Sequence, residues 1–270
     1  MAKPTKPAWV IDKERARRAA AAETLWLFGI HAVRDALMNP ARQRLRLVVT
    51  RNAADRLTDA IAASGMDPEI ADARKFPVPL DPGSVHQGAA LEVRPLDWGA
   101  LEACCAPAPD APALVVLLDR VSDPHNVGAV LRSAEVFGAR AVIAPARHAA
   151  PETGALAKTA SGALERQPYL RVKNLADAMT RLQEMGYVLL GLDGEAETDL
   201  SDALARAAAS PAPPAIGLVL GAEGPGLRDR TRATCDALVR IPAAGAFGSL
   251  NVSNAAAVAL YAAHMAQRAR

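Results

Sequence analysis

The sequence contains little cysteine, and its pattern suggests neither a disulfide framework nor a metal site. Its three cysteines are the adjacent Cys104 and Cys105, in a stretch rich in Pro and Ala, and the isolated Cys235. No C-x-x-C pair occurs, and none of the five histidines has the spacing of metal ligands. We therefore interpret the cysteines as incidental and expect no bound metal.

Long apolar runs are also lacking. A helix that spans a bilayer needs about 18 consecutive apolar residues, and no segment of the sequence approaches that length. The first residues do not contain the apolar core of a signal peptide and are instead crowded with Lys and Arg. We expect a cytoplasmic protein whose residues 1–22 form a basic arm without fixed structure.

The chain carries little net charge and few aromatic residues. A formal charge of +2 does not mark the whole chain as a polyanion binder. RNA binding stays open, because phosphate contacts depend on local basic patches rather than on the total charge. Aromatic residues make up 4% of a chain that is 51% hydrophobic, so we expect a core built mainly from Ala, Val and Leu.

The sequence does contain two blocks of alternating helix and strand patterns. In the first block, residues 23–98, residues 45–50 alternate like a half-buried strand, and residues 56–64 predict a helix that Gly65 closes. We expect a small α/β domain there. Residues 99–113 are rich in Pro and Ala and predict a linker.

The second block, residues 114–270, predicts a larger α/β domain. Continuous apolar runs, typical of strands buried on both faces, lie at residues 114–118, 141–144, 188–192 and 216–220. Helical patterns lie between and after these runs, at residues 127–137, 175–185 and 253–268. Alternating strands and helices favour a parallel sheet covered on both faces, and Ser253 or Asn254 is suited to cap the last helix.

Three polar segments follow predicted strands, where ligands of open α/β sheets bind. The first, residues 119–128, leads into a helix that carries Arg132 opposite its apolar stripe; a solvated arginine and a phosphate clamp both explain that position. The second, residues 220–227, holds three glycines around Glu223, which lets a ligand approach the backbone but is not a phosphate loop. The third, residues 241–254, gathers Ser and Asn residues that helix capping explains only in part.

In this order, the three segments resemble the motifs of the SpoU/TrmH family of RNA ribose methyltransferases, within the trefoil-knotted SPOUT superfamily. The likeness extends to Gly-Ile-His-Ala-Val-Arg-Asp-Ala-Leu at 29–37, Ser-Val-His-Gln-Gly at 84–88 and Ser-Gly-Ala-Leu-Glu at 161–165. The resemblance implies a knotted α/β methyltransferase domain with a parallel sheet over residues 114–270. It also implies a small α/β RNA substrate-binding domain over residues 23–98, and a homodimer.

The activity that the resemblance implies is methyl transfer from S-adenosylmethionine to a ribose 2′-hydroxyl, most like the branch that modifies a guanosine of 23S rRNA. Methylation of tRNA within the same family is an alternative. A non-catalytic RNA-binding assembly factor would predict decay in at least one motif, and we find none. A dinucleotide-dependent dehydrogenase would need a G-x-G-x-x-G loop after the first strand of the second block, where Asp119 and Arg120 stand instead.

The resemblance also assigns the residues of the site. Its catalytic positions fall on Asn126, Arg132, Glu223, Ser249 and Asn251, and its methyl-donor contacts fall on Leu220, Gly221, Gly224, Ile241 and Leu250. The arginine is expected to engage an RNA phosphate near the pocket of a second subunit, and the glutamate to support the first asparagine. A ribose hydroxyl is a weak nucleophile, so the reaction needs proton removal and in-line positioning but no metal. The resemblance gives the neighbouring His125 no role as a base.

Overall fold

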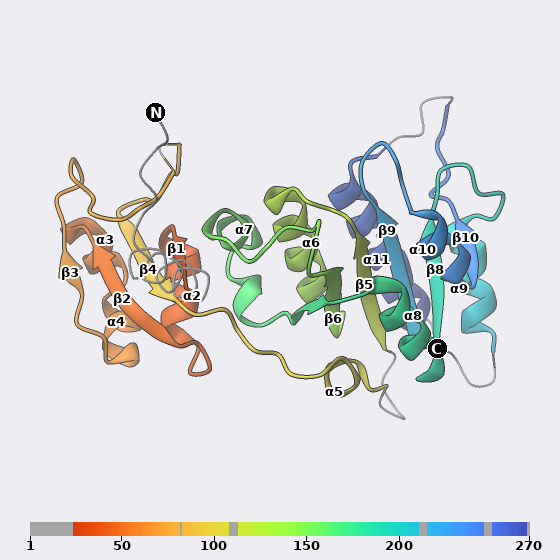
Figure 1. Ribbon diagram of the computed structural model, residues 1–270, viewed down its shortest axis with the longest axis horizontal. Coiled ribbons are helices and arrows are strands. Elements are labelled where there is room, and N and C mark those ends of the chain that lie inside the picture. Colours follow the sequence, from red (N-terminus) through yellow and green to blue (C-terminus); the bar gives the residue numbers. More distant parts are fainter. Residues whose placement is uncertain (1–23, 82, 108–112, 211–214, 246–249, 269–270) are drawn as a thin grey trace, which may run out of the picture. The chain divides into compact units, whose positions relative to one another are not determined.

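The computed structural model describes residues 24–81, 83–107, 113–210, 215–245 and 250–268, and its elements are labelled in Figure 1. The chain separates into two compact units, each described here by itself. Unit 1 comprises the chain up to Leu96 together with Glu152–Lys158. Unit 2 comprises Asp97–Pro151 and the chain from Thr159 onward.

Unit 1 is a four-stranded sheet with helices. Its elements in chain order are β1 (Leu25–Phe28), α2 (Ile30–Met38), β2 (Arg44–Val49), α3 (Arg51–Arg56), α4 (Thr58–Ser64), β3 (Glu69–Ile70) and β4 (Ala89–Val93). The strand order is β1-β4-β2-β3, with β4 antiparallel to both of its neighbours and β3 parallel to β2. The predicted helix at residues 56–64 is in fact two helices, which meet at Leu57; Gly65 ends the second in the left-handed conformation that favours glycine.

One buried arginine explains why a segment distant in sequence groups with unit 1. The Arg42 side chain is 0% exposed, and its Nη1 donates to the Arg94 carbonyl at 2.8 Å and to Glu152 Oε1 at 2.7 Å. A buried guanidinium needs such partners, because an unpaired charge away from water is costly. The predicted domain over residues 23–98 therefore lacks Glu152–Lys158, which groups with unit 1.

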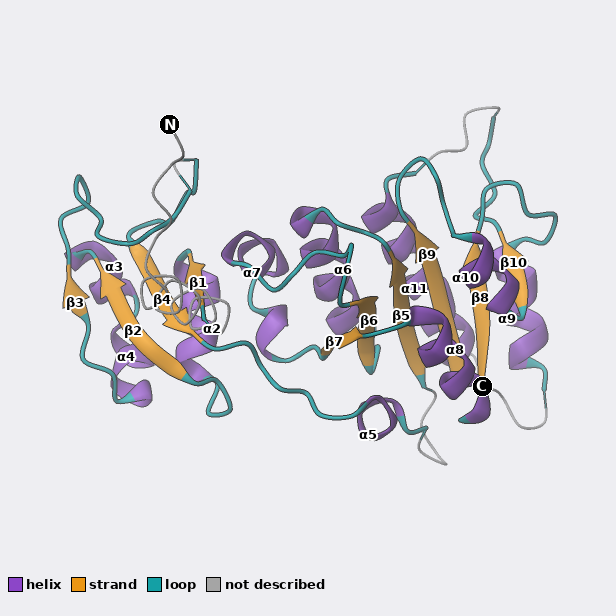
Figure 2. Cartoon of the chain, in the orientation of Figure 1, coloured by secondary structure: helices purple, strands orange, loops and turns teal. Residues whose placement is uncertain are grey.

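Unit 2 is a six-stranded parallel sheet with helices on both faces (Figure 2). Its elements in chain order are α5 (Leu101–Cys105), β5 (Leu114–Asp119), α6 (Pro124–Val136), β6 (Ala141–Pro145), α7 (Gly154–Ala160, whose first residues group with unit 1), η1 (Ala163–Glu165), β7 (Tyr169–Val172), α8 (Leu175–Glu184), β8 (Tyr187–Leu192), α9 (Leu200–Ala208), β9 (Ala215–Gly221), α10 (Asp229–Thr234), β10 (Ala237–Val239) and α11 (Val252–Arg268). The strand order is β10-β8-β9-β5-β6-β7, and every pairing is parallel.

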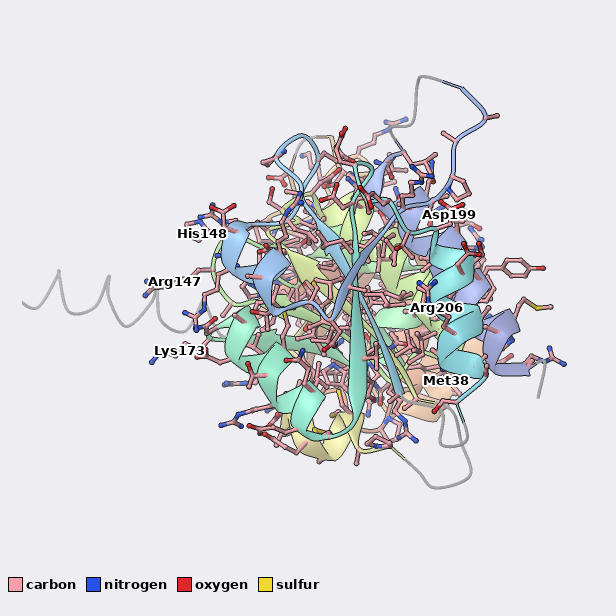
Figure 3. All side chains as sticks on the ribbon, turned by 90° about the vertical axis from the view of Figure 1, so that its right-hand side faces the viewer. Met38, Arg147, His148, Lys173, Asp199 and Arg206 are labelled. Atoms are coloured by element: carbon pink, nitrogen blue, oxygen red, sulfur yellow. The ribbon has the colours of Figure 1, made fainter. Side chains whose placement is uncertain are left out.

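The two faces of this sheet carry different helices. Helices α6 and α9 pack against α11 on one face, and α5 and α10 pack against α8 on the other (Figure 3). The central strand β5 is buried along its whole length, as its continuous apolar run predicted. The predicted parallel α/β sheet is thus confirmed, together with the strands at residues 114–118, 141–144, 188–192 and 216–220, which extend by a residue or more at one or both ends.

Some local predictions were wrong. Residues 101–105 form helix α5 within the predicted linker, and Cys105 is fully buried in the core of unit 2, where its carbonyl accepts from Tyr187 Oη at 2.7 Å. The side chain at the start of α11 that accepts from the backbone is that of Asn251, not Ser253 or Asn254. The short edge strands β7 and β10 were not predicted, because four and three residues carry too little pattern.

Four further predictions concern the basic arm, the knot, membrane spans and metal binding. The predicted basic arm, residues 1–22, lies outside the described residues, and the trefoil knot stays a prediction. Among the described residues, no helix combines the length and the apolar character that crossing a bilayer requires. The same part of the chain contains no cluster of three or more His, Cys, Asp or Glu side chains placed to hold a metal ion.

Candidate active site

Neighbouring strands bring the first two polar segments together. Strands β5 and β9 are adjacent and parallel, and Asp119 at the end of β5 lies opposite Gly221 at the end of β9. The loops that leave these strands therefore start side by side at the carboxyl edge of the sheet, the edge where open α/β folds bind ligands. The first loop enters α6 through Asp123, whose Oδ1 accepts from the His125 backbone N–H at 2.9 Å.

A hydrogen-bonded cluster links all three segments. The Oε1 atom of Glu223 accepts from Asn126 Nδ2 at 3.0 Å and from Asn251 Nδ2 at 2.6 Å. Asn251 Nδ2 also lies 3.0 Å from Asn126 Oδ1. We call these three residues the amide–carboxylate cluster. One carboxylate oxygen thus orients two amide groups, and such charge-assisted hydrogen bonds are stronger than neutral ones.

The orientation of Asn251 is fixed from its other side as well. Its Oδ1 accepts from the Ser253 backbone N–H at 2.9 Å and from Ser253 Oγ at 2.6 Å. The amide nitrogen of Asn251 must then face Glu223, because its oxygen is already engaged as an acceptor. The Asn251 side chain therefore caps the start of α11 with its oxygen and completes the cluster with its nitrogen. Helix capping thus explains only part of the polar residues in the third segment.

A cavity of about 850 Å³ opens beside the cluster, within the usual size of a small-molecule site. It is lined by residues from the loops after β8 and β9 and from the segment that leads into α11. All five predicted methyl-donor contacts line it, namely Leu220, Gly221, Gly224, Ile241 and Leu250. Glu223 and Asn251 line it too, so the cluster forms part of its wall.

The glycines after β9 are required by close backbone approach. A Cβ atom on Gly221 would lie 2.1 Å from the carbonyl carbon of Gly226, which is backbone and cannot move aside. Gly224 and Gly226 adopt φ values of 88° and 67°, which L side chains rarely adopt. The loop folds back on itself through a hydrogen bond from the Gly226 N–H to the Ala222 carbonyl at 3.0 Å. Glycine here shapes one wall of the cavity.

The lining suits S-adenosylmethionine. Leu220, Ile241 and Leu250 offer apolar surface for a flat base, and backbone groups of the glycine loop offer hydrogen bonds at its edge. Three carboxylates also line the cavity: Asp193 is paired with Arg232, which lines it too, and Glu195 and Glu223 complement a ligand that carries cationic ammonium and sulfonium groups. These residues would hold the methyl donor, whose chemical contribution is an electrophilic methyl carbon.

Three acidic residues at or after the ends of β5 and β8 were given no role from the sequence. Asp193 and Glu195 lie in the loop after β8, and a position after a strand is the same signal that identified the three polar segments. Asp193 forms an ion pair with Arg232. Asp119 is fully buried, and its carboxylate accepts hydrogen bonds from the Arg228 backbone N–H at 3.0 Å and from Arg228 Nε at 2.7 Å. A lone aspartate at a strand end gave no signal of that partner, 109 positions away in the chain.

Two other predicted site residues, Arg132 and Ser249, are not part of the cluster as the structure describes it. Arg132 is exposed on α6 and makes no hydrogen bond or ion pair with the described residues. It lies six positions after Asn126, so the two side chains leave α6 in different directions. Ser249 lies outside the described residues. His125 Nδ1 lies 3.0 Å from Thr159 Oγ1 and takes no part in the cluster.

Neither Cys105 nor Cys235 fits the role of a nucleophile. Burial, followed by the nearby charges of Asp236 and Asp119, raises the pKa of Cys235 to about 12. Burial also raises the pKa of Cys105 to about 12. Thiols with such pKa values are protonated at neutral pH and unreactive.

Comparison with known proteins places this site in a family. The SpoU rRNA Methylase family matches residues 113–261. The chain is 38% identical over 250 residues to the 23S rRNA (guanosine-2'-O-)-methyltransferase RlmB of Vibrio vulnificus, covering 88% of this chain and 95% of that protein. It is also 38% identical to the RlmB of Ralstonia nicotianae, over 88% and 94% of the two chains.

Solved structures agree in fold. The SpoU methyltransferase AviRb from Streptomyces viridochromogenes, in complex with AdoMet, superposes with a TM-score of 0.73 at 25% identity, covering 94% of this chain and 93% of that one. An AdoMet-bound rRNA methyltransferase from Sinorhizobium meliloti shares the fold with a TM-score of 0.73 at 21% identity, over 93% and 90% of the chains. The family match, the relatives and the fold lead to one conclusion: the chain belongs to the SpoU rRNA methylase family.

Proposed function

We propose that this protein transfers the methyl group of S-adenosylmethionine to the ribose 2′-hydroxyl of a guanosine in 23S rRNA. The observation that carries the proposal is the amide–carboxylate cluster in the wall of the cavity. It joins one residue from each of the three polar segments, through side chains up to 125 positions apart in the chain. The substrate follows from the relatives that share 38% identity over most of the chain, which are named for that reaction.

The cluster and Arg132 divide the work of the reaction. S-adenosylmethionine held in the cavity would supply an electrophilic methyl carbon to the ribose 2′-oxygen, with its sulfur as the leaving group, and the hydroxyl proton would pass to water. Glu223 holds Asn126 and Asn251 in one geometry, so that their amides position the reacting groups without reorganising. Arg132 binds an RNA phosphate, and its positive charge favours the developing alkoxide.

We infer that Arg132 acts in the cavity of a second copy of the chain. Val136 lies four positions after Arg132, on the same side of α6, and is 68% exposed. The neighbouring α11 adds the exposed apolar residues Val258, Tyr261 and Met265. A second copy that covers this apolar face would bury it and bring Arg132 beside a cavity, which is how a homodimer would complete the site.

The same reaction suggests roles for unit 1 and for the rest of unit 2. We propose that unit 1 binds the RNA substrate, that unit 2 contains the family's knot, and that the protein works in the cytoplasm, where ribosomes are made. The predicted substrate-binding domain over residues 23–98 and the predicted methyltransferase domain over 114–270 belong to this proposal, corrected for the helix at Leu101–Cys105 and for the grouping of Glu152–Lys158 with unit 1.

The substrate is tested by deleting the gene and mapping ribose methylations in the rRNA and tRNA of the deletion strain. We expect one 2′-O-methylguanosine to disappear from 23S rRNA and to return when the gene is restored. An unchanged 23S pattern would contradict the proposal, and loss of a tRNA methylation in the same strain would assign the protein to tRNA.

The role of Arg132 is tested by substitution and by complementation between two impaired variants. Arg132→Ala should abolish methyl transfer and leave S-adenosylmethionine binding intact, whereas Arg206→Ala, an exposed arginine on α9, should change neither. Co-expression of Arg132→Ala with Glu223→Ala should restore about a quarter of the wild-type activity, because half of the dimers are mixed and each mixed dimer has one intact site. No recovery in isolated mixed dimers would show that Arg132 does not act across subunits.

A further inference from the structure

A second cavity in unit 2 is strongly basic. It has a volume of about 780 Å³ and lies where the loop after β6, the start of α8 and the start of α10 meet. We call it the basic groove and define it by Arg147, His148, Lys173, Arg228 and Arg230, all of which line it. Figure 3 shows Arg147, His148 and Lys173 together on the side of the sheet that carries α8 and α10, while Arg206 lies on the opposite side.

Two of these cations carry uncompensated charge. Asp177, which also lines the groove, is paired with Arg230 at 2.9 Å, and Asp119 is paired with Arg228 at 2.7 Å. Arg147 and Lys173 are exposed and form no ion pair with the described residues. The groove therefore presents a local positive potential that the nearly neutral chain as a whole does not.

The loop that carries Arg147 and His148 is held in a defined shape. Arg171 donates from Nη1 to the Ala150 carbonyl and from Nη2 to the Ala146 carbonyl, each at 2.7 Å. The Ala146 N–H donates to the Val172 carbonyl at 2.7 Å, so both ends of the loop are fixed. A cationic loop supported in this way can bind a ligand without a large loss of conformational entropy.

The basic groove shares a wall with the methyl-donor cavity. Leu227 and Arg232 line the cavity, whereas Arg228, Arg230 and Thr231 line the groove. Residues 227–232 thus separate the two spaces, and the bond from Arg228 to the buried Asp119 holds this wall against the sheet. A polymer whose reacting nucleotide sits at the cavity would pass over this wall into the groove.

We propose that the basic groove binds the phosphate backbone of the RNA that flanks the methylated nucleotide, an inference that rests on the proposed function. No Phe, Tyr or Trp side chain is among the described residues that line it, whereas several Arg and Lys side chains line it, so phosphate contacts are favoured over base stacking. Cationic side chains that contact phosphates position the RNA without reading its sequence. Arg147 and Lys173 are the residues that carry this contact.

The test uses the double variant Arg147→Ala/Lys173→Ala of the full chain, with Arg206→Ala as the matched control and Arg147→Lys/Lys173→Arg as the charge-conserving variant. The RNA is an unmethylated 23S rRNA transcript. Filter binding over a range of salt concentrations gives the Kd and its salt dependence, and steady-state methyl transfer gives KM for RNA and kcat. Calorimetry gives the affinity for S-adenosylmethionine.

We expect the double variant to raise Kd and KM for RNA several-fold and to lower the slope of log Kd against log salt by about 1.4–1.8, because each of the two lost phosphate contacts removes about 0.7–0.9. The kcat at saturating RNA and the affinity for S-adenosylmethionine should not change. The charge-conserving variant should bind like the wild type, and so should Arg206→Ala.

Three results separate the possible failures. A Kd and salt slope equal to those of Arg206→Ala would overturn the basic groove as an RNA site, and would leave an acidic protein segment as its candidate ligand. Equal losses in the alanine and charge-conserving variants would also overturn it, because the contact would not be electrostatic. If the double variant weakens RNA binding but the wild type methylates no 23S transcript, the groove stands and the proposed function fails.

Discussion

Replacing Arg228 with alanine should destabilise unit 2 far more than replacing Arg230, two positions away. Arg228 pairs with Asp119, whose side chain is 0% exposed, and Arg230 pairs with Asp177, whose side chain is 61% exposed. Both pairs are Arg–Asp contacts, of 2.7 and 2.9 Å. The two substitutions therefore differ mainly in whether the carboxylate left behind can reach water.

The magnitude follows from that difference. Removing one partner of a buried ion pair costs about 3–5 kcal/mol, because the other charge stays buried without compensation. The Arg228 side chain is 47% exposed, so water can enter the space that it leaves, and we expect the lower end, about 3 kcal/mol. The exposed Arg230 pair should contribute about 0–1 kcal/mol. With a urea m value of about 1–3 kcal/mol per molar, 3 kcal/mol lowers the unfolding midpoint by about 1–3 M.

The assay is urea unfolding followed by the fluorescence of Trp98, which packs against the core of unit 2, in a background where Trp9 and Trp26 are Phe. Adding Asp119→Asn to Arg228→Ala should recover part of the loss, because a neutral amide is cheaper to bury than a carboxylate. Equal midpoints for Arg228→Ala and Arg230→Ala would refute the reasoning.

Three further predictions concern the site and the thiols. Glu223→Ala removes the acceptor of two amides and should lower kcat by at least about tenfold, whereas Glu223→Gln keeps an acceptor oxygen and should lower kcat less. Steady-state methyl transfer measures both values. Equal losses of kcat would show that the charge of Glu223 matters more than the geometry that it imposes. Gly221→Ala should abolish S-adenosylmethionine binding in calorimetry, because its Cβ meets backbone, while Gly245→Ala, which meets nothing within 4 Å, should not. Because their pKa values are raised to about 12, Cys105 and Cys235 should resist alkylation at pH 8 in the folded protein and react once urea restores an ordinary thiol pKa. Mass spectrometry measures the modification of each cysteine. Alkylation of either one in the folded protein would contradict its burial.

The sequence by itself determined the four inner strands of the unit 2 sheet and the segments that form the site. Continuous apolar runs identify buried parallel strands because both faces of such strands meet helices, and the segments that follow them lie at the ligand-binding edge by the geometry of parallel sheets. The order of three polar segments was enough to predict the family, and hence the methyl donor. These features are local in the chain, so each leaves a readable pattern.

Only the tertiary structure decided which side chains meet. The hydrogen bonds from Asn126 and Asn251 to Glu223, the pair of Asp119 with Arg228, and the basic groove all join residues from separate loops. Contacts between side chains so far apart in the chain depend on strand order and on loop shape, neither of which a periodic pattern records. The burial of Cys105 shows the same limit: a Pro/Ala-rich segment reads as a linker until a sheet is present to cover it.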